Sequence, residues 1–135
     1  MTEEKAEDKL KSKKNILIID DDFLFQNIIK KKSDNSRYNT DSCSHVLQAS
    51  LYLENKKPDL ILLDILMPGM SGLEFLSYLR FNLNYLKIPV IVTSVLSESQ
   101  VLDSSFKLGA NDFFQKPVNI VQLFNRIDNL LSEKT

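Results

Sequence analysis

Four short apolar runs, each followed by polar residues, constrain the fold of this chain more than any other feature. The runs cover residues 15–19, 60–63, 90–92 and 112–115, and they lead into Asp20-Asp21-Asp22, Asp64, Thr93-Ser94 and Lys116 respectively. Short apolar runs separated by helical patterns are typical of buried parallel strands. Because the carboxyl ends of parallel strands meet at one edge of an open sheet, we expect these polar residues to converge there.

The pattern between the runs alternates strand and helix five times, which predicts a three-layer α/β sandwich. Strands are predicted over 15–20, 38–43, 59–64, 89–94 and 112–115, and the second of these is polar enough to be an edge strand. Helices are predicted from Phe23, over 45–55, from a capping box at Ser71, from about 97 to a stop at Gly109, and from Asn119. In the first helix, Phe23, Leu24, Ile28 and Ile29 are expected to form the apolar stripe.

Length and composition suit one soluble domain. The chain has 135 residues, 43% of them apolar and 26% charged, with a net charge of −1 that does not favour nucleic acid or an anionic membrane. We expect a charged tail over 1–14, one domain over 15–131 and a short tail over 132–135. The single cysteine excludes an internal disulfide, and no run is long enough for a membrane span, so a cytoplasmic location is expected.

The acidic residues at the run ends indicate a cation site. Adjacent carboxylates after a buried strand are costly unless a cation offsets them. Asp22 has a simpler explanation, because it precedes the first helical residue and suits an N-cap. Asp20, Asp21 and Asp64 have no cysteine or histidine companion, which favours a hard cation such as Mg²⁺. The alternative is that these acids merely end strands.

The remaining run ends add groups that handle a phosphoryl group. Lys116 can neutralise it as a point charge, and a hydroxyl at Ser94 can donate a hydrogen bond to it. A carboxylate nucleophile, a divalent cation, a lysine and a hydroxyl together indicate phosphoryl transfer to an aspartate. With only three glycines in the chain, a glycine-rich nucleotide loop is not expected.

In this order, the motifs resemble the receiver domain of response regulators in two-component signalling. The resemblance covers about residues 15–131 and is carried by the Asp20-Asp21-Asp22 run, the stretch Asp-Ile-Leu-Met-Pro-Gly-Met-Ser-Gly over 64–72, the hydroxyl after 90–92, and Gly-Ala-Asn-Asp-Phe over 109–113 leading to Lys116-Pro117. The stretch over 64–72 is specific by itself. The resemblance implies a flavodoxin-like fold with strand order 2-1-3-4-5.

The same resemblance implies roles for the site residues. Asp64 would accept the phosphoryl group and Lys116 would pair with it. A Mg²⁺ or Mn²⁺ ion would be held directly by Asp21, partly through water by Asp20, and by Asp64 and the backbone carbonyl of Leu66. The aromatic three residues before the lysine, Phe113, would turn inward when the domain is phosphorylated, and the Lys116-Pro117 bond would be cis.

Two neighbouring hydroxyls compete for the role of switch residue. Ser94 lies thirty residues after Asp64 and twenty-two before Lys116, the spacing usual in the family, so we favour it over Thr93. Strand alternation sends the two side chains to opposite faces, so only one of them is expected to serve.

The implied function is a signalling switch and not a classical enzyme. A histidine kinase or histidine phosphotransfer protein would phosphorylate Asp64, the domain would take part in its own phosphorylation and dephosphorylation, and the face formed by the fourth helix, fifth strand and fifth helix would signal to a protein effector. Direct binding to nucleic acid or membrane is not expected. A homodimer through that face is compatible with the resemblance, although no residue argues for it.

Three departures from the family pattern and two alternatives complete the interpretation. Val95 stands where the family usually has alanine or glycine, and its bulk would narrow access to Asp64. Leu66 and Leu96 are apolar at positions where polar side chains can orient the attacking water, which predicts a long-lived aspartyl phosphate. One alternative is a phosphohydrolase of the haloacid dehalogenase type with Asp20 as nucleophile, but it needs a late acidic pair and leaves Asp64 unexplained. The other is a non-phosphorylated pseudo-receiver that serves as a scaffold, against which the intact acid, hydroxyl and lysine set argues.

Overall fold

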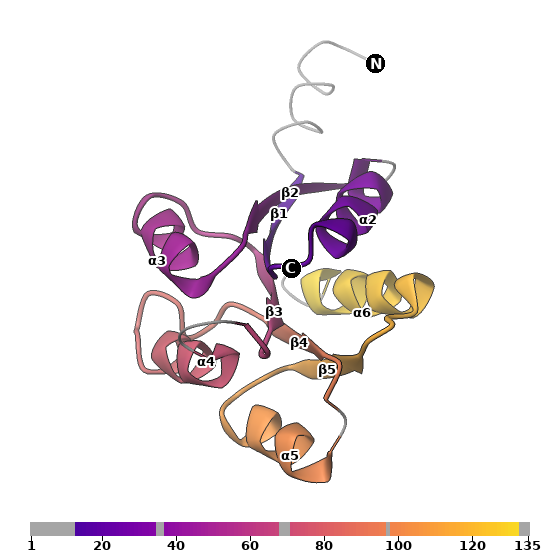
Figure 1. The fold of residues 1–135 in the computed structure, drawn as a ribbon. Helices are drawn as coiled ribbons and strands as arrows, with labels where there is room; N and C mark the ends of the chain where they lie inside the picture. The colour runs from indigo at the N-terminus through magenta and orange to yellow at the C-terminus, as the bar shows by residue number, and fades with distance from the viewer. Residues whose placement is uncertain (1–12, 35–36, 68–70, 97, 133–135) are drawn as a thin grey trace.

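The computed structural model describes residues 13–34, 37–67, 71–96 and 98–132, which form a five-stranded parallel sheet. Its strands are β1 (Lys14–Ile19), β2 (Tyr38–Cys43), β3 (Leu60–Asp64), β4 (Val90–Ser94) and β5 (Asp112–Gln115). Their spatial order is β2-β1-β3-β4-β5, all parallel, as predicted (Figure 1). Each predicted strand is found to within one residue at either end.

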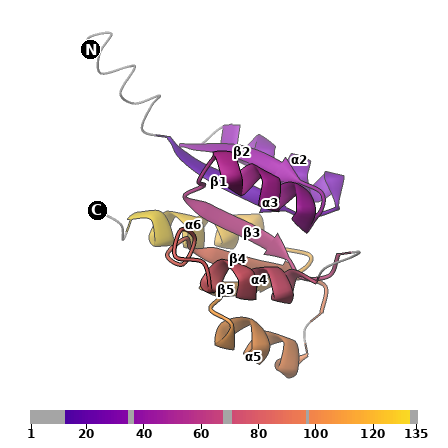
Figure 2. The same cartoon turned by 90° about the vertical axis from the view of Figure 1, so that its left-hand side faces the viewer.

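Helices follow the strands and cover both faces of the sheet. The described residues form α2 (Phe23–Asp34), α3 (Val46–Asn55), α4 (Gly72–Arg80), α5 (Ser99–Lys107) and α6 (Ile120–Ser132). Figure 1 places α2 and α6 together on one side of the sheet, and Figure 2 looks onto α3 and α4 on the other. This arrangement confirms the three-layer sandwich.

Two separate apolar clusters show which way each strand residue points. Leu17, Ile61 and Val92 pack into the cluster beneath α3 and α4, whereas Ile18, Leu62 and Ile91 pack against α2 and α6. Alternate residues therefore face opposite layers, as the pleat requires. We call these the α3/α4 face and the α2/α6 face.

The buried stripe of α2 differs from the prediction. Phe23 and Leu24 are 66% and 76% exposed and Ile28 is also exposed, so of the four predicted residues only Ile29 is buried. The buried positions are Phe25, Gln26, Ile29 and Ser33. The prediction was wrong because it followed hydrophobicity alone, whereas the helix turns Phe25 and Gln26 toward the end of β1 to support the polar edge.

Local signals in the sequence set several helix ends as expected. The Oδ1 atom of Asp22 accepts hydrogen bonds from the backbone of Leu24 and Phe25, so it caps α2. The Ser71 hydroxyl accepts from the backbone N–H three residues on at 3.2 Å and caps α4. Gly109 has a φ of 104°, a left-handed value that suits glycine after the end of α5.

Arg80 ties the end of α4 to the turn before β5. Its guanidinium donates to the carbonyls of Gly109 at 2.9 Å, Leu86 at 3.2 Å and Ile88 at 2.9 Å, and to Oδ1 of Asn111 at 3.1 Å. A Cβ on Gly109 would lie only 2.8 Å from Arg80 Nε, so the glycine also leaves room for this contact. The arginine therefore fixes the position at which β5 begins.

Along the described part of the chain, we find no helix with the length and apolar character needed to cross a bilayer.

Candidate acidic site at the carboxyl ends of the strands

Three carboxylates converge where β1 and β3 end. Oxygen atoms of Asp20, Asp21 and Asp64 all lie within 4.8 Å of one another. Asp20 and Asp64 are buried, with 0% and 5% of their surface exposed, whereas Asp21 is open to solvent. Because β1 and β3 are neighbours in the sheet, residues 44 positions apart meet at one edge, as their positions in the sequence predicted.

Backbone and side-chain contacts hold Asp20 in place. Its N–H donates to the carbonyl of Cys43 at 3.0 Å, and its own carbonyl accepts from the side-chain amide of Gln26. Its Oδ1 atom accepts from the backbone of Asp22 at 2.9 Å. The sequence interpretation missed Gln26, whose signal was a polar residue on the buried side of an otherwise apolar first turn.

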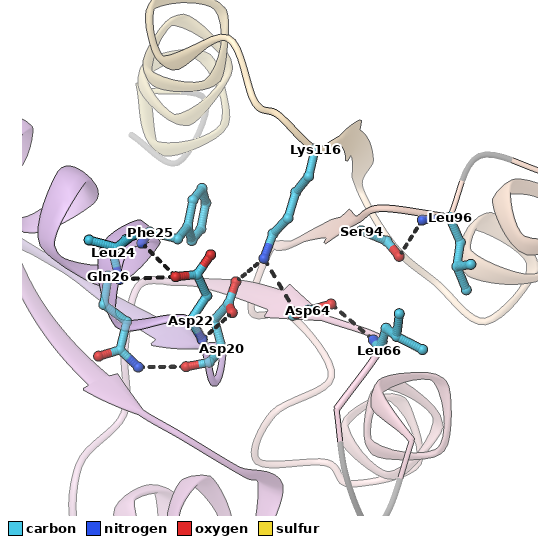
Figure 3. Close-up of polar contacts among 10 residues, drawn as sticks. All are labelled: Asp20, Asp22, Leu24, Phe25, Gln26, Asp64, Leu66, Ser94, Leu96 and Lys116. Carbon is cyan, nitrogen blue, oxygen red and sulfur yellow. Dashed lines mark hydrogen bonds and ion pairs between the residues drawn. The ribbon is translucent and has the colours of Figure 1, made fainter.

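Lys116 reaches across the sheet to both buried acids. Its Nζ lies 2.6 Å from Oδ2 of Asp20 and 3.4 Å from Oδ2 of Asp64 (Figure 3). The ammonium also lies 4.7 Å from the centre of the Phe25 ring, within range of a cation–π contact. Lys116-Pro117 is cis, as the resemblance implied. In the structure described here, the lysine makes its shorter contact with Asp20.

The two buried acids favour the charged form of Lys116. Burial lowers the pKa of Lys116, but the hydrogen bond to Asp20 and the charges of Asp20 and Asp64 raise it, and the net direction is upward. The ammonium therefore stays protonated at neutral pH and supplies a fixed positive charge beside Asp64.

At Asp64, in contrast to Lys116, burial has a larger effect on the pKa than the neighbouring hydrogen bonds and charges. Burial is the largest effect and raises the pKa of its carboxyl group, and the charge of Asp20 adds to this. The N–H of Leu66, which donates to Oδ1 at 2.9 Å, and the ammonium of Lys116 lower it without cancelling the rise. A further positive charge at this edge would therefore favour the ionised form of Asp64.

The donor set fits a hard divalent cation. All three clustered groups are carboxylates, Lys116 contacts two of them, and the third, Asp21, is exposed to solvent. Mg²⁺ prefers oxygen ligands and usually keeps several waters, which matches this partly open edge. The backbone of Leu66 lies beside Asp64 through the N–H contact above, although the ligand role of its carbonyl stays a prediction.

The two predicted switch residues are present near the edge. The Ser94 hydroxyl accepts from the backbone N–H of Leu96 at 3.1 Å, and the Ser94 carbonyl accepts from the N–H of Lys116 at 2.7 Å. Phe113 is half-buried against the core cluster of the α3/α4 face. Their roles as switch hydroxyl and switch aromatic stay predictions. Pro68, Gly69 and Met70 of the predicted motif lie outside the described residues.

Fold and site together define a flavodoxin-like domain with an acidic site at the carboxyl edge of its sheet. A family model described as the response regulator receiver domain matches residues 16–128. The chain belongs to this family. Receiver domains are generally signalling switches of two-component systems and not classical enzymes, which favours the signalling interpretation over the hydrolase alternative.

Known proteins resemble the chain over most of its length. Sporulation initiation phosphotransferase F of Bacillus subtilis (strain 168) is 31% identical over 120 residues, which cover 89% of this chain and 95% of that protein. The probable transcriptional regulator ycf29 of Cyanophora paradoxa is 36% identical over 90% of this chain but only 58% of its own length. Two further curated regulators match this chain over only 47% and 52% of their own lengths. The chain therefore spans about half the length of several curated relatives.

Solved structures give the same result. The signal receiver domain of a signal transduction histidine kinase from Syntrophus aciditrophicus has a TM-score of 0.84 and 31% identity, covering 90% of this chain and 92% of that one. The chemotaxis protein CheY4 of Vibrio cholerae has a TM-score of 0.82 at 20% identity, which supports the fold.

Proposed function

We propose that this domain accepts a phosphoryl group on Asp64 from a phosphohistidine of a histidine kinase or histidine phosphotransfer protein. The observation that carries the proposal is the meeting of Asp20, Asp21 and Asp64 with Lys116 at one edge of the sheet. Because such donors derive their phosphoryl group from cellular ATP, we place the domain in the cytoplasm.

The geometry favours Asp64 over Asp20 as the nucleophile. Asp20 is 0% exposed and its carboxylate is engaged by a backbone N–H and by Lys116, so it has little freedom to attack. Asp64 has one oxygen oriented by the Leu66 N–H, and its other oxygen contacts Lys116 only at 3.4 Å. In the transfer, this second oxygen forms a bond to phosphorus while the phosphorus–nitrogen bond breaks and its electron pair returns to the donor imidazole.

The charged residues at this edge of the sheet would stabilise the incoming phosphoryl group. Asp20, Asp21, Asp64 and the carbonyl of Leu66 would hold Mg²⁺ or Mn²⁺, which when bound supplies neutralising charge for the phosphoryl oxygens. Lys116 would shift from its contact with Asp20 toward those oxygens, because a dianionic group attracts an ammonium more strongly than a single carboxylate does.

Phosphorylation would be signalled through the face of α5, β5 and α6. Ser94 would turn its hydroxyl from the Leu96 N–H toward the phosphoryl group, and Phe113 would turn inward. Phe106 on α5 and Val121 on α6 are 45% and 63% exposed and would be available for apolar contacts with a protein effector or a second copy of the domain.

The phosphorylated state should be long-lived. Leu66 and Leu96, two residues beyond Asp64 and Ser94, offer no polar group to orient an attacking water. The bulk of Val95, which is 57% exposed, would narrow access to Asp64. We expect decay over minutes or longer when phosphate loss is followed in the Mg²⁺-loaded protein. Loss within seconds would contradict this expectation.

One experiment separates the candidate functions. Wild type, Asp64→Asn and Asp20→Asn are treated with acetyl phosphate, or with beryllofluoride as a phosphoryl mimic, in the presence of Mg²⁺, and the adduct is measured by intact mass and by ¹⁹F or amide NMR. A phosphoryl adduct that disappears in Asp64→Asn supports the proposal. A folded wild type that forms no adduct indicates the scaffold, and phosphate-ester turnover lost mainly in Asp20→Asn indicates the hydrolase.

A further inference from the structure

A second hydroxyl at the site is buried without a hydrogen-bond partner. Thr93 on β4 is 1% exposed, and among the described residues its Oγ1 atom has no partner. Burying an unpaired hydroxyl is unfavourable, and valine would fill nearly the same space without this cost. The position therefore raises the question of when the hydroxyl obtains a partner.

The sheet register places Thr93 beside Asp64. The two residues are Cα partners between β3 and β4, and the pair two residues earlier, Leu62 and Ile91, packs into the α2/α6 cluster. Side chains two residues apart on a strand share a face. Thr93 and Asp64 therefore both project toward the α2/α6 face at the carboxyl end of the sheet.

The same register places Thr93 between Asp64 and Lys116. On β5, Phe114 is the Cα partner of Thr93 and packs against the α2/α6 cluster, and Lys116 follows two residues later. Figure 3 shows the Lys116 side chain extending from the end of β5 back toward Asp20 and Asp64. Because β4 lies between β3 and β5 in the sheet, the lysine must span the strand that carries Thr93 in order to reach Asp64.

Ser94 is in a different position. It follows Thr93 and so projects toward the α3/α4 face, and its hydroxyl already accepts the Leu96 N–H at 3.1 Å. The expectation that only one of the two hydroxyls can serve holds if both must make the same contact with the phosphoryl group. It does not hold for two contacts made from opposite sides of the site.

We propose that Thr93 is a positioning residue whose hydroxyl accepts a hydrogen bond from the Lys116 ammonium in the phosphorylated state. This proposal rests on the proposed function. The ammonium has three donors, and in the structure it uses them on Asp20 and Asp64 and lies over Phe25. When a phosphoryl group on Asp64 draws the ammonium away from Asp20, the buried hydroxyl beside Asp64 gains a partner.

The consequence is a preference for the phosphorylated state. A contact stabilises one state over another only to the extent that it differs between them. Thr93 is unpaired before phosphorylation and paired afterwards, so removing the hydroxyl should stabilise the resting domain and weaken its phosphorylated form. A buried threonine without a role would produce only the first effect.

The test compares Thr93→Val with a matched buried hydroxyl elsewhere. Ser33 on α2 is 0% exposed and its Oγ also lacks a partner among the described residues, but it lies in the last turn of the helix, ten residues after the end that meets the site. Ser33→Ala therefore reports the effect of removing an orphaned hydroxyl alone. Thr93→Ser and Thr93→Ala form a second pair, which differs only in the hydroxyl and covers the case in which the valine variant fails to fold.

The measurements are beryllofluoride affinity with Mg²⁺ and urea unfolding of the unmodified protein. We expect Thr93→Val to raise the unfolding midpoint and to weaken beryllofluoride binding about tenfold, as expected for the loss of one hydrogen bond to a charged group. Thr93→Ser should bind several-fold more tightly than Thr93→Ala, and Ser33→Ala should bind like wild type.

Two results would overturn the Thr93 proposal. One is wild-type affinity in Thr93→Val, and the other is equal affinity in Thr93→Ser and Thr93→Ala, which would point to packing. Failure of the proposed function looks different, because folded wild type would then form no adduct, or Asp64→Asn would keep it. In that case the Thr93 proposal falls as well.

Discussion

Gly72 packs against the strand end that carries Asp64, and replacing it with alanine should displace that strand end. A Cβ at position 72 would lie 2.4 Å from the Cα of Ile65 and 2.6 Å from the carbonyl oxygen of Asp64. Carbon atoms separate to about 3.5 Å in comfortable contact, so α4 or the chain at Asp64 must move by roughly 1 Å. Both contacts are to backbone atoms, which cannot rotate out of the way.

Two opposing effects set the magnitude. Alanine is favoured over glycine inside a helix by about 0.5–1 kcal/mol. Overpacking a buried position costs about 1–3 kcal/mol, and the rigid backbone contacts place Gly72→Ala at the upper end. The clash therefore wins, and we expect a net loss of about 2 kcal/mol in the free energy of unfolding. For a domain of this size, that lowers the thermal midpoint by roughly 6–10 °C.

Urea unfolding followed by circular dichroism measures the stability, and intact mass after acetyl phosphate treatment measures the rate of phosphorylation. Because the displaced atoms adjoin the proposed nucleophile, we expect slower phosphorylation even under conditions where Gly72→Ala is fully folded. Ser77→Ala in the same helix is the control, since it changes helix propensity without a backbone clash. Equal or greater stability of Gly72→Ala relative to wild type would refute the steric reasoning.

Three further predictions concern the charges and the Arg80 contacts. In metal-free protein the Asp64 carboxyl should titrate above the ordinary aspartate value of about 3.9, as followed by ¹³C NMR. Because the pKa of this carboxyl is higher in the folded than in the unfolded state, its ionisation lowers the free energy of unfolding. The free energy of unfolding should therefore rise as the pH falls through the folded-state pKa, and Asp64→Asn should remove this pH dependence. Mg²⁺ should raise the thermal midpoint and EDTA should reverse the gain, whereas Asp21→Asn should weaken the effect; a midpoint unmoved by millimolar Mg²⁺ would argue against the cation site. Arg80→Met should lose about 2–3 kcal/mol in urea unfolding because its charged hydrogen bonds to Gly109 and neighbouring groups vanish, and a wild-type midpoint would contradict this.

The polar strand β2 shows how far pattern reading could go. Its sequence, Tyr-Asn-Thr-Asp-Ser-Cys, has only its first and last residues buried, yet the strand occupies the predicted residues and lies at the edge of the sheet beside β1. An edge strand needs fewer apolar contacts, so its polarity was informative. The pattern failed on α2, where Phe23 and Leu24 are exposed and Gln26 is buried, because the end of β1 supplies a carbonyl that only the folded chain reveals.

The sequence by itself determined the strands and their order along the chain, because the alternation of strand and helix patterns is a local property. It also determined that Asp20 and Asp64 would meet, because the carboxyl ends of parallel strands lie at one edge of the sheet. Only the tertiary structure decided that Lys116, 96 residues from Asp20, makes its shorter contact there, at 2.6 Å compared with 3.4 Å to Asp64. It also decided that Thr93 shares a face with Asp64 while its hydroxyl has no partner among the residues that the structure describes. The physical reason is that distances and burial depend on how the strands and helices pack, and packing joins residues that no local pattern relates.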